Sequence, residues 1–449
     1  MFKYFPHTEQ DIQEMLKACS LNSLDELYKE VPESIRFKGD YQIPEAMSEI
    51  ELRRHFEALG AKNTLLTCFA GAGCYDHYTP SVIPSIIQRS EYLTSYTPYQ
   101  AEISQGTLHY IFEFQSMMSR LTGLPVSNAS MYDGATATAE AAMMMMASAK
   151  KADCVLVSET VDPKVLRVIE TYAHFRGFAV KRIAAENGVT SRADMQQKLS
   201  EGGAAGVIVQ QPNYYGVIED YGGFADDCHE HKALLTINSV IADLALLKTP
   251  GEWGADIAVG DGQSLGIPMS FGGPSVGYMC CTEKLMRKMP GRIVGETVDS
   301  RGQRCYVLTL QAREQHIRRQ KATSNICSNQ SLMALFVTIY CSLMGKEGLQ
   351  EAARLSYNGA HYLAEQLCGS AGSGSSSSGR GAEFTLTYRQ PFFNEFCVDY
   401  SGDIEALQRR CIEAGFLAGV KVADHTLMLA VTESRSKAEI DQLVKIMKG

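Results

Sequence analysis

Short apolar segments that alternate with helical segments constrain the fold of this chain more than any other feature. Each apolar segment has the length of a buried strand, and helical stretches separate the first five of them. Strands that alternate with helices in this way are typical of a mostly parallel sheet with helices on both faces. The sequence therefore predicts an α/β protein with central strands at residues 154–157, 178–183, 206–209, 234–237, 256–259 and 276–281.

Three regions are expected along the 449 residues. Residues 1–70 are predicted to be a helical segment, because Thr8 followed by Asp11 resembles a capping box at a helix start. Residues 71–330 contain the predicted sheet and are expected to form a large α/β domain. Residues 331–449 are expected to begin with a long linking helix and to continue as a small α+β domain.

Several segments carry local predictions of their own. A second helix is expected near residues 23–30, whereas residues 69–106 are rich in Gly, Pro, Tyr, Ser and Thr and are expected to form long loops. The helix predicted over 135–149 is apolar nearly all round, so we expect it to be buried, with its run of methionines in the core. The low-complexity Gly/Ser run 369–382 is expected to be an exposed, flexible loop.

The bulk composition limits the partners and the location of the protein. A net charge of -9 argues against a nucleic-acid partner. No stretch approaches the roughly 18 continuous apolar residues of a membrane span, and the N-terminal residues lack an apolar signal core. The 13 cysteines are irregularly spaced without a CxxC pair, which is typical of reduced thiols. We therefore expect a cytoplasmic protein without a membrane partner.

Two charged clusters have alternative interpretations. His229, Glu230 and His231 could suggest a metal site, but histidines two apart do not share a helix face. A solvated polar face is favoured there, and no metal site is predicted. The second cluster is basic. It either binds an anion or acidic partner surface, or forms a salt-bridged face beside a helix that starts near residues 323–324. Its members are Arg313, Arg318, Arg319 and Lys321.

The stretch 256–277, DIAVGDGQSLGIPMSFGGPSVG, predicts a strand, a polar turn and a glycine-rich loop that leads into a second strand. In pyridoxal phosphate (PLP) enzymes of fold type I, a lysine at this place holds the cofactor as a Schiff base. Here Gln263 stands at that place. The acid that faces the pyridine nitrogen is also missing, because residues 238–240, after the strand 234–237, are Asn, Ser and Val, and Asp243 is the nearest carboxylate.

A third support of such a cofactor is the start of a helix that receives its phosphate. Asp133 and Gly134 precede an Ala-rich helix and resemble that start, since free N–H groups at a helix N-terminus bind anions. Asp133 can instead cap the helix with its own carboxylate, and the structural cap is favoured. Gln263 and Asp133 are therefore interpreted as a vestigial cofactor site, and no cofactor is expected on this chain.

The run YTPYQAEISQG at residues 96–106 gathers hydrogen-bonding side chains in one turn-rich segment. Such groups are costly to bury unless each finds a partner, so the run is either a polar surface loop or part of a site. Its candidate site residues are Tyr96, Thr97, Tyr99, Gln100, Glu102, Ser104 and Gln105.

Five runs give the chain a family resemblance. They occur in family order, and two of them, YTPYQAEISQG and REQHIRRQKATSNIC, are highly specific. The chain resembles the alpha, or N-terminal, subunit of the split glycine decarboxylase, the P-protein of the glycine cleavage system. The match weakens in the C-terminal domain, although QPFFNEF at 390–396 fits it. The runs are FPHTEQDIQEML (5–16), FAGAGCYDHYTPSVIP (69–84), YTPYQAEISQG (96–106), NASMYDGATATAEAA (128–142) and REQHIRRQKATSNICSNQ (313–330).

The resemblance implies PLP fold type I and an α2β2 assembly. In that assembly the beta subunit holds PLP on its lysine, and the alpha subunit is a related copy without cofactor. Together they decarboxylate glycine and pass the aminomethyl group to the lipoyl arm of the H-protein. The candidate residues of 96–105 would then lie near the shared active-site entrance. Two alternatives stay open: a self-sufficient PLP enzyme that uses another lysine, such as Lys284 or Lys248, and a scaffold or regulator without chemistry.

Overall fold

The computed structural model describes residues 4, 6–311, 315–369 and 383–449, in two compact units, Met1–Thr64 and Leu65–Gly449. The first unit contains two α-helices and two 3₁₀ helices, α1 (Glu9–Ala18), η1 (Leu24–Tyr28), η2 (Glu33–Ile35) and α2 (Glu49–Gly60). The predicted capping box is confirmed, since Thr8 Oγ1 accepts from the Asp11 N–H and Asp11 Oδ2 accepts from the Thr8 N–H.

The second expected helix of this unit is present, and it is short. Residues 24–28 form a 3₁₀ helix of 5 residues, and Ser23 makes no side-chain capping bond to its first turn.

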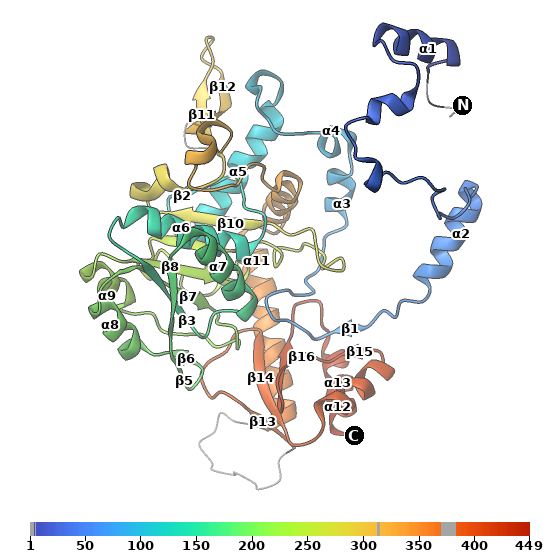
Figure 1. The fold of residues 1–449 in the computed structure, drawn as a ribbon. Coiled ribbons are helices and arrows are strands. Elements are labelled where there is room, and N and C mark those ends of the chain that lie inside the picture. The colour runs from blue at the N-terminus through green and yellow to red at the C-terminus, as the bar shows by residue number, and fades with distance from the viewer. Residues whose placement is uncertain (1–3, 5, 312–314, 370–382) are drawn as a thin grey trace. The chain divides into compact units, whose positions relative to one another are not determined.

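A seven-stranded sheet forms the centre of the second unit, in the order β2-β10-β9-β8-β7-β3-β4 (Figure 1). The strands from β9 to β4 run parallel, and β10 is antiparallel to both β9 and β2. The predicted, mostly parallel sheet is confirmed. Its strands are β2 (Val126–Ser127), β3 (Cys154–Ser158), β4 (Ala179–Ile183), β7 (Ala204–Gln211), β8 (Leu234–Ser239), β9 (Ile257–Asp261) and β10 (Gly277–Cys281).

Helices cover both faces of this sheet, as the sequence predicts. They include α5 (Gln105–Thr122), α6 (Gly134–Ser148), α7 (Pro163–Arg176), α8 (Arg192–Ser200) and α9 (Phe224–Glu230). Successive side chains of a strand point to opposite faces. Val155 and Val157 of β3 accordingly pack with α6 and α7, whereas Cys154 and Leu156 pack with α8 and α9.

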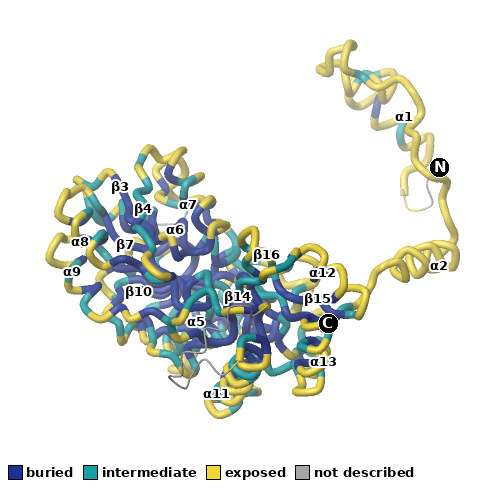
Figure 2. Tube along the Cα trace, turned by 90° about the horizontal axis from the view of Figure 1, so that it is seen from below, coloured by how far each residue is buried: buried dark blue, intermediate teal, exposed yellow. Residues whose placement is uncertain are grey.

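Helix α6 lies in the interior of the molecule, as its apolar sequence predicts (Figure 2). Met144 and Met145 are buried against strands of the sheet, and Met143 and Met146 are partly buried. The four methionines therefore fill the core. The N-terminus of α6 is directed to the sheet edge where β9 ends, because the Gly134 N–H is bonded to Asp261.

Shorter elements complete the large domain. The loop-rich segment 69–106 contains brief helices that the sequence did not predict, since proline and serine interrupt any longer helical period: α3 (Val82–Ile87), α4 (Ser90–Leu93) and η3 (Ala101–Ile103). A hairpin projects from the sheet in Figure 1. A second hairpin, with two residues in each strand, follows β4. The remaining elements are β5 (Ala185–Glu186), β6 (Val189–Thr190), η4 (Asp243–Ala245), η5 (Glu283–Lys288), the projecting β11 (Ile293–Val298) and β12 (Arg304–Thr309), α10 (Gln315–Arg318) and η7 (Arg319–Lys321).

A long helix, α11 (Ser331–Cys368), links the large domain to a small α+β domain, with a non-helical break at Gly345. The helix start expected near 323–324 is wrong, because α11 begins 7 residues after Ser324. The low-complexity run lies outside the described residues from 370 onward. The small domain contains β13 (Phe384–Leu386), β14 (Glu395–Tyr400), α12 (Ile404–Glu413), β15 (Phe416–Leu417), β16 (Val420–Ala423), β17 (Thr426–Ala430) and α13 (Lys437–Lys448).

Two further features concern how the small domain is connected to the rest of the chain. A short strand, β1 (Thr67–Cys68), pairs in parallel with β15, so the start of the second unit joins the end of the chain. Helix α11 is long and apolar enough to cross a membrane by length and composition alone, but 44% of its most apolar window is buried inside the protein. A buried core helix of a soluble protein meets the same two criteria.

Candidate functional site

A pocket of about 260 Å³ lies at the carboxyl edge of the sheet. Gln210, Asn238 and Asp261 reach it from the ends of β7, β8 and β9, and the first turns of α6 and α7 complete its wall. The carboxyl edge of parallel strands is where open α/β sheets bind their ligands. The lining residues are Ala72, Gly73, Cys74, Asp133, Gly134, Ala135, Asp162, Lys164, Val165, Gln210, Asn238, Ser239, Val240, Asp261 and Ser264.

Gln263 is buried beside this pocket, but its side chain is engaged elsewhere. Its Oε1 accepts from the Tyr75 N–H at 2.9 Å, and its Nε2 donates to the carbonyls of Tyr75 and Ile267, each at 2.7 Å. The residue is 5% exposed and does not line the pocket. Gln263 therefore fastens the loop at Tyr75 to the β9–β10 connection.

Asp133 caps α6, as the sequence favours. Its Oδ1 accepts from the Thr136 N–H at 2.8 Å, and the Asp133 N–H donates to Thr136 Oγ1 at 3.3 Å. A carboxylate at this position neutralises the positive end of the helix dipole and satisfies a free N–H group.

Asp261 is the site residue that sequence reasoning missed. Its Oδ2 accepts from the Gly134 N–H at 2.9 Å, and its Oδ1 accepts from the Gln263 N–H at 2.8 Å and from Ser275 Oγ. Burial raises the pKa of this carboxyl above its usual value, although the hydrogen bonds from Ser275, Gly134 and Gln263 offset part of that rise. The signal in the sequence was an acid at the last position of a buried strand, next to the expected cofactor loop.

A second buried carboxylate lies behind the loop 72–75. Glu395, on β14 of the small domain, accepts from the Ala72 N–H at 2.5 Å and from the Tyr75 hydroxyl at 3.0 Å. Burial raises the pKa of Glu395 to about 7, against these two hydrogen bonds. Tyr75 is also bonded to Gln263. The loop 72–75 therefore connects the β9–β10 connection of the large domain with β14 of the small domain.

The candidate residues of 96–105 lie away from the pocket, none of them among its lining. Gln105 bonds both backbone groups of Tyr306, each at 2.9 Å, and so ties α5 to the projecting hairpin. The Tyr99 hydroxyl accepts from Arg292 Nη2 at 3.1 Å. Each of the other five side chains is exposed or partly exposed, and Tyr96 is 81% exposed. They are Tyr96, Thr97, Gln100, Glu102 and Ser104.

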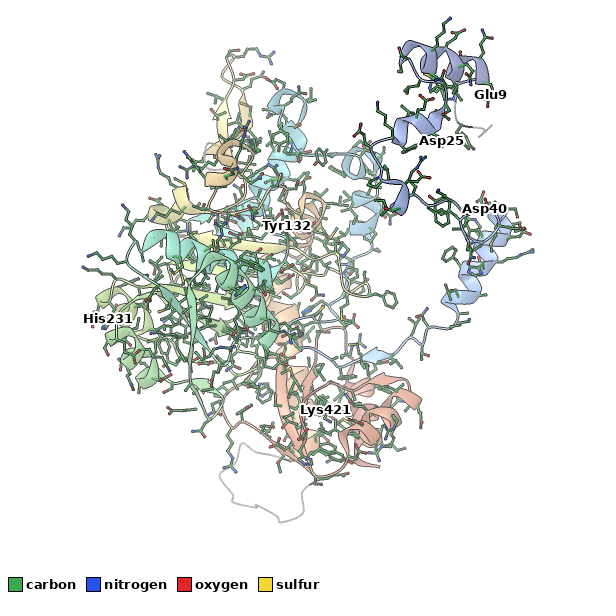
Figure 3. The ribbon with its side chains drawn as sticks, in the orientation of Figure 1. Glu9, Asp25, Asp40, Tyr132, His231 and Lys421 are labelled. Carbon is green, nitrogen blue, oxygen red and sulfur yellow. The ribbon has the colours of Figure 1, made fainter. Side chains whose placement is uncertain are left out.

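The histidine pair forms no shared site. His229 Nε2 lies 2.9 Å from Asp256 Oδ2, whereas His231 Nδ1 lies 2.9 Å from the Asp227 carbonyl, and Figure 3 shows His231 at the edge of the molecule. Among the residues that the structure describes, no group of three His, Cys, Asp or Glu side chains is placed to hold a metal ion.

The basic cluster is partly described. Arg318 lines a second pocket of about 220 Å³ with Arg287 and Lys288, and Arg319 and Lys321 lie in the exposed turn η7. The fourth predicted member, at position 313, lies outside the described residues. The interpretation as an anion or acidic-partner surface stays a prediction.

The fold itself defines a class. Glutamate decarboxylase from Lactobacillus brevis has a similar structure, with a TM-score of 0.67 over 94% of this chain and 96% of that chain, at 11% sequence identity. Such a likeness shows the fold alone: the chain has the type I fold of PLP-dependent enzymes.

Closer comparisons define the family. Residues 2–447 match the model of the family described as glycine cleavage system P-protein. The "Probable glycine dehydrogenase (decarboxylating) subunit 1" of Desulforamulus reducens is 46% identical over 451 residues, 98% of each chain. A crystal structure of glycine decarboxylase (P-protein) in inhibitor-bound form has a TM-score of 0.88 and 38% identity, covering 100% of this chain and 99% of that chain. The chain belongs to the P-protein family and corresponds to subunit 1, the N-terminal subunit of its split form.

The residues of this pocket do not fit PLP. Gln263, beside the pocket at the position where a lysine is expected, is bonded to backbone groups, and Asn238 and Ser239, the last two residues of β8, supply no acid. Two N–H groups of the first turn of α6, where a phosphate would bind, donate instead to side chains: that of Gly134 to Asp261 and that of Thr136 to Asp133. Lys164 lines the pocket, but its Nζ donates to the Ala72 carbonyl at 3.1 Å.

The lysines considered as alternatives also lie outside the pocket lining. Lys248 Nζ lies 3.7 Å from the centre of the Trp253 ring, a cation–π contact, and Lys284 lies in η5 on the surface. Neither placement supports a Schiff base in this pocket.

Proposed function

We propose that this chain is the subunit of glycine dehydrogenase (aminomethyl-transferring) that does not bind PLP. A beta subunit holds the cofactor on its lysine, and two copies of each chain form an α2β2 complex. The complex decarboxylates glycine and transfers the aminomethyl group to the lipoyl arm of the H-protein. It is a cytoplasmic complex that has no nucleic-acid, membrane or metal partner.

One observation carries the proposal. The pocket lies at the carboxyl edge of the sheet, the place of a type I site, yet at its helix start the Gly134 N–H donates to Asp261 and the Thr136 N–H donates to Asp133. A chain of this family without a usable cofactor pocket needs a second chain for the chemistry. Membership of the subunit 1 group, along nearly the full length, supports the same conclusion.

This chain then contributes to the chemistry by contacting the beta subunit, not by supplying catalytic groups. Segment 96–103 presents Tyr96 and Ile103, each 81% exposed, and Gln105 of α5 connects it to the projecting hairpin by donating to the carbonyls of Ala101 and Tyr306. Exposed aromatic and aliphatic side chains on a fixed backbone are suited to an interface. In the proposed complex they border the entrance to the active site of the beta subunit.

The test is an exchange assay of labelled CO2 with the carboxyl group of glycine, with the H-protein present. We expect activity from alpha plus beta and little from either chain alone. Full activity of beta alone would make this chain a scaffold or regulator. A visible PLP aldimine on the alpha chain alone, fixed by borohydride, would make it a self-sufficient enzyme.

A further inference from the structure

We infer that Asp261 is a built-in anion that keeps phosphate-bearing ligands out of the pocket, whatever residue stands at position 263. The inference rests on the proposed function in that this chain carries no cofactor. It goes further in assigning the exclusion to a specific carboxylate rather than to the missing lysine.

The donors around Asp261 form a complete anion site. They are the N–H groups of Gly134 and Gln263 and the hydroxyl of Ser275, which we name the anion seat. Each of the three can donate to an ionised carboxylate, and bonds of this kind favour the charged form. The anion seat includes the first N–H of α6, the group that a bound phosphate would need.

Close backbone packing fixes the carboxylate in the anion seat. A Cβ atom at Gly134 would lie 2.8 Å from the Asp261 nitrogen and 3.0 Å from the Asp261 Cβ, so the two backbones touch. Asp261 also lies in register opposite Gly277 at the end of the β9–β10 pair. The side chain therefore reaches Gly134 from a rigid strand end and does not depend on a mobile loop.

The charge around the anion seat opposes a second anion. Asp133, Asp162 and Asp261 line the pocket, and Lys164 is the cation among the lining residues. A phosphate would meet these carboxylates at short range in a partly buried site, where like charges repel more strongly than in water. Restoring a lysine at position 263 leaves this repulsion in place.

The experiment compares PLP with pyridoxal, which lacks the phosphate, on the purified full-length chain. Binding is measured by equilibrium dialysis for wild type and for Asp261→Asn, with Asp162→Asn as the matched control in the same pocket. We expect Asp261→Asn to raise the affinity for PLP by about tenfold or more and to leave that for pyridoxal unchanged. Asp162→Asn should raise PLP affinity by less than about threefold, because its carboxylate caps α7 instead of α6.

A second arm tests the lysine directly. PLP and borohydride are added to Gln263→Lys and to Gln263→Lys/Asp261→Asn, and pyridoxylated peptides are identified by mass. We expect modification at position 263 in the double variant alone. Equal modification of the single variant, or equal effects of Asp261→Asn on PLP and pyridoxal, would overturn the inference. If Asp261→Asn fails to fold by circular dichroism, Asp261→Ser, which leaves the anion seat open, replaces it. A wild-type chain that binds PLP covalently would instead overturn the proposed function.

Discussion

The side-chain amide of Gln263 pairs with the backbone of Tyr75 as one strand pairs with another, accepting from its N–H at 2.9 Å and donating to its carbonyl at 2.7 Å. The two residues are 188 positions apart. At the position where the sequence predicts a cofactor lysine, this chain has a side chain that connects two distant loops. The first prediction concerns the free energy that these hydrogen bonds contribute to folding.

Gln263→Leu should destabilise the chain by about 3 kcal/mol, because it leaves the buried backbone groups of Tyr75 and the Ile267 carbonyl without partners. The free energy of unfolding in urea measures this change. Gln197→Leu, at an exposed position of α8, is the control and should stay within about 0.5 kcal/mol of wild type. A loss at position 263 no larger than the control would show that these hydrogen bonds contribute nothing.

Glu395 should make stability depend on pH. Its pKa is raised from 4.5 to about 7 in the folded chain, so between these values the folded state binds the extra proton. Its contribution is fully present below about pH 4.5 and is lost as the pH rises through about 7. Relative to Glu395→Gln, wild type should therefore lose about 3 kcal/mol of unfolding free energy over that interval.

The measurement is urea unfolding of both proteins at several pH values. Glu230→Gln, at an exposed position of α9, controls for removal of a carboxylate. A difference between wild type and Glu395→Gln that does not change with pH would refute the prediction.

Tyr99→Ala and Gln100→Ala should lower the activity of the reconstituted complex by about tenfold or more while this subunit still folds, since misplaced groups at an active-site entrance slow catalysis. Glycine–CO2 exchange with the beta subunit measures the effect, and circular dichroism checks the fold. Phe175→Ala, which removes an exposed aromatic side chain from α7, is the control. Wild-type activity in both variants would refute the proposed placement of segment 96–103 at the active-site entrance.

Deleting Met1–Thr64 should leave the second unit folded. Among the described residues of the first unit, Leu16 is the buried large apolar side chain, whereas Ile50, Leu52 and Phe56 of α2 are exposed. Burial within this unit therefore contributes little, and the Tm of the remainder should change by less than about 2 °C in calorimetry. Binding of the beta subunit in sedimentation should weaken, because exposed apolar side chains of this kind are suited to a partner. Unchanged binding would contradict that second expectation.

Local patterns allowed much of this structure to be predicted. The six apolar segments became six strands of one sheet, because each buried strand carries its own signal in consecutive residues. The cap at Asp133 was recognisable for the same reason, since its partner Thr136 is three positions away. The type of the short helix at 24–28 was not, because a 3₁₀ turn and an α-turn have similar local sequences.

The functional centre depends on contacts that no local pattern contains. Asp261 meets Gly134 across 127 positions, and Glu395 meets Ala72 across 323. In these two contacts Gly134 and Ala72 take part through their backbone N–H groups, which carry no sequence signal. The interpretation of Gln263 as the substitute for a lysine stays a prediction, whereas the direction of its amide, toward Tyr75 instead of the pocket, is decided by the folded chain.

The pairing of β1 with β15 constrains the order in which parts of the chain can fold during synthesis. Thr67 lies opposite Phe416, and the loop that follows Thr67 supplies Ala72 and Cys74 to the pocket. A chain that leaves the ribosome from its N-terminus must hold this loop without its partners until almost the whole protein has emerged. The sheet can form first, but the pocket closes last. A polypeptide that ends before residue 416 would contain every strand of the central sheet but would lack β15, the partner of β1.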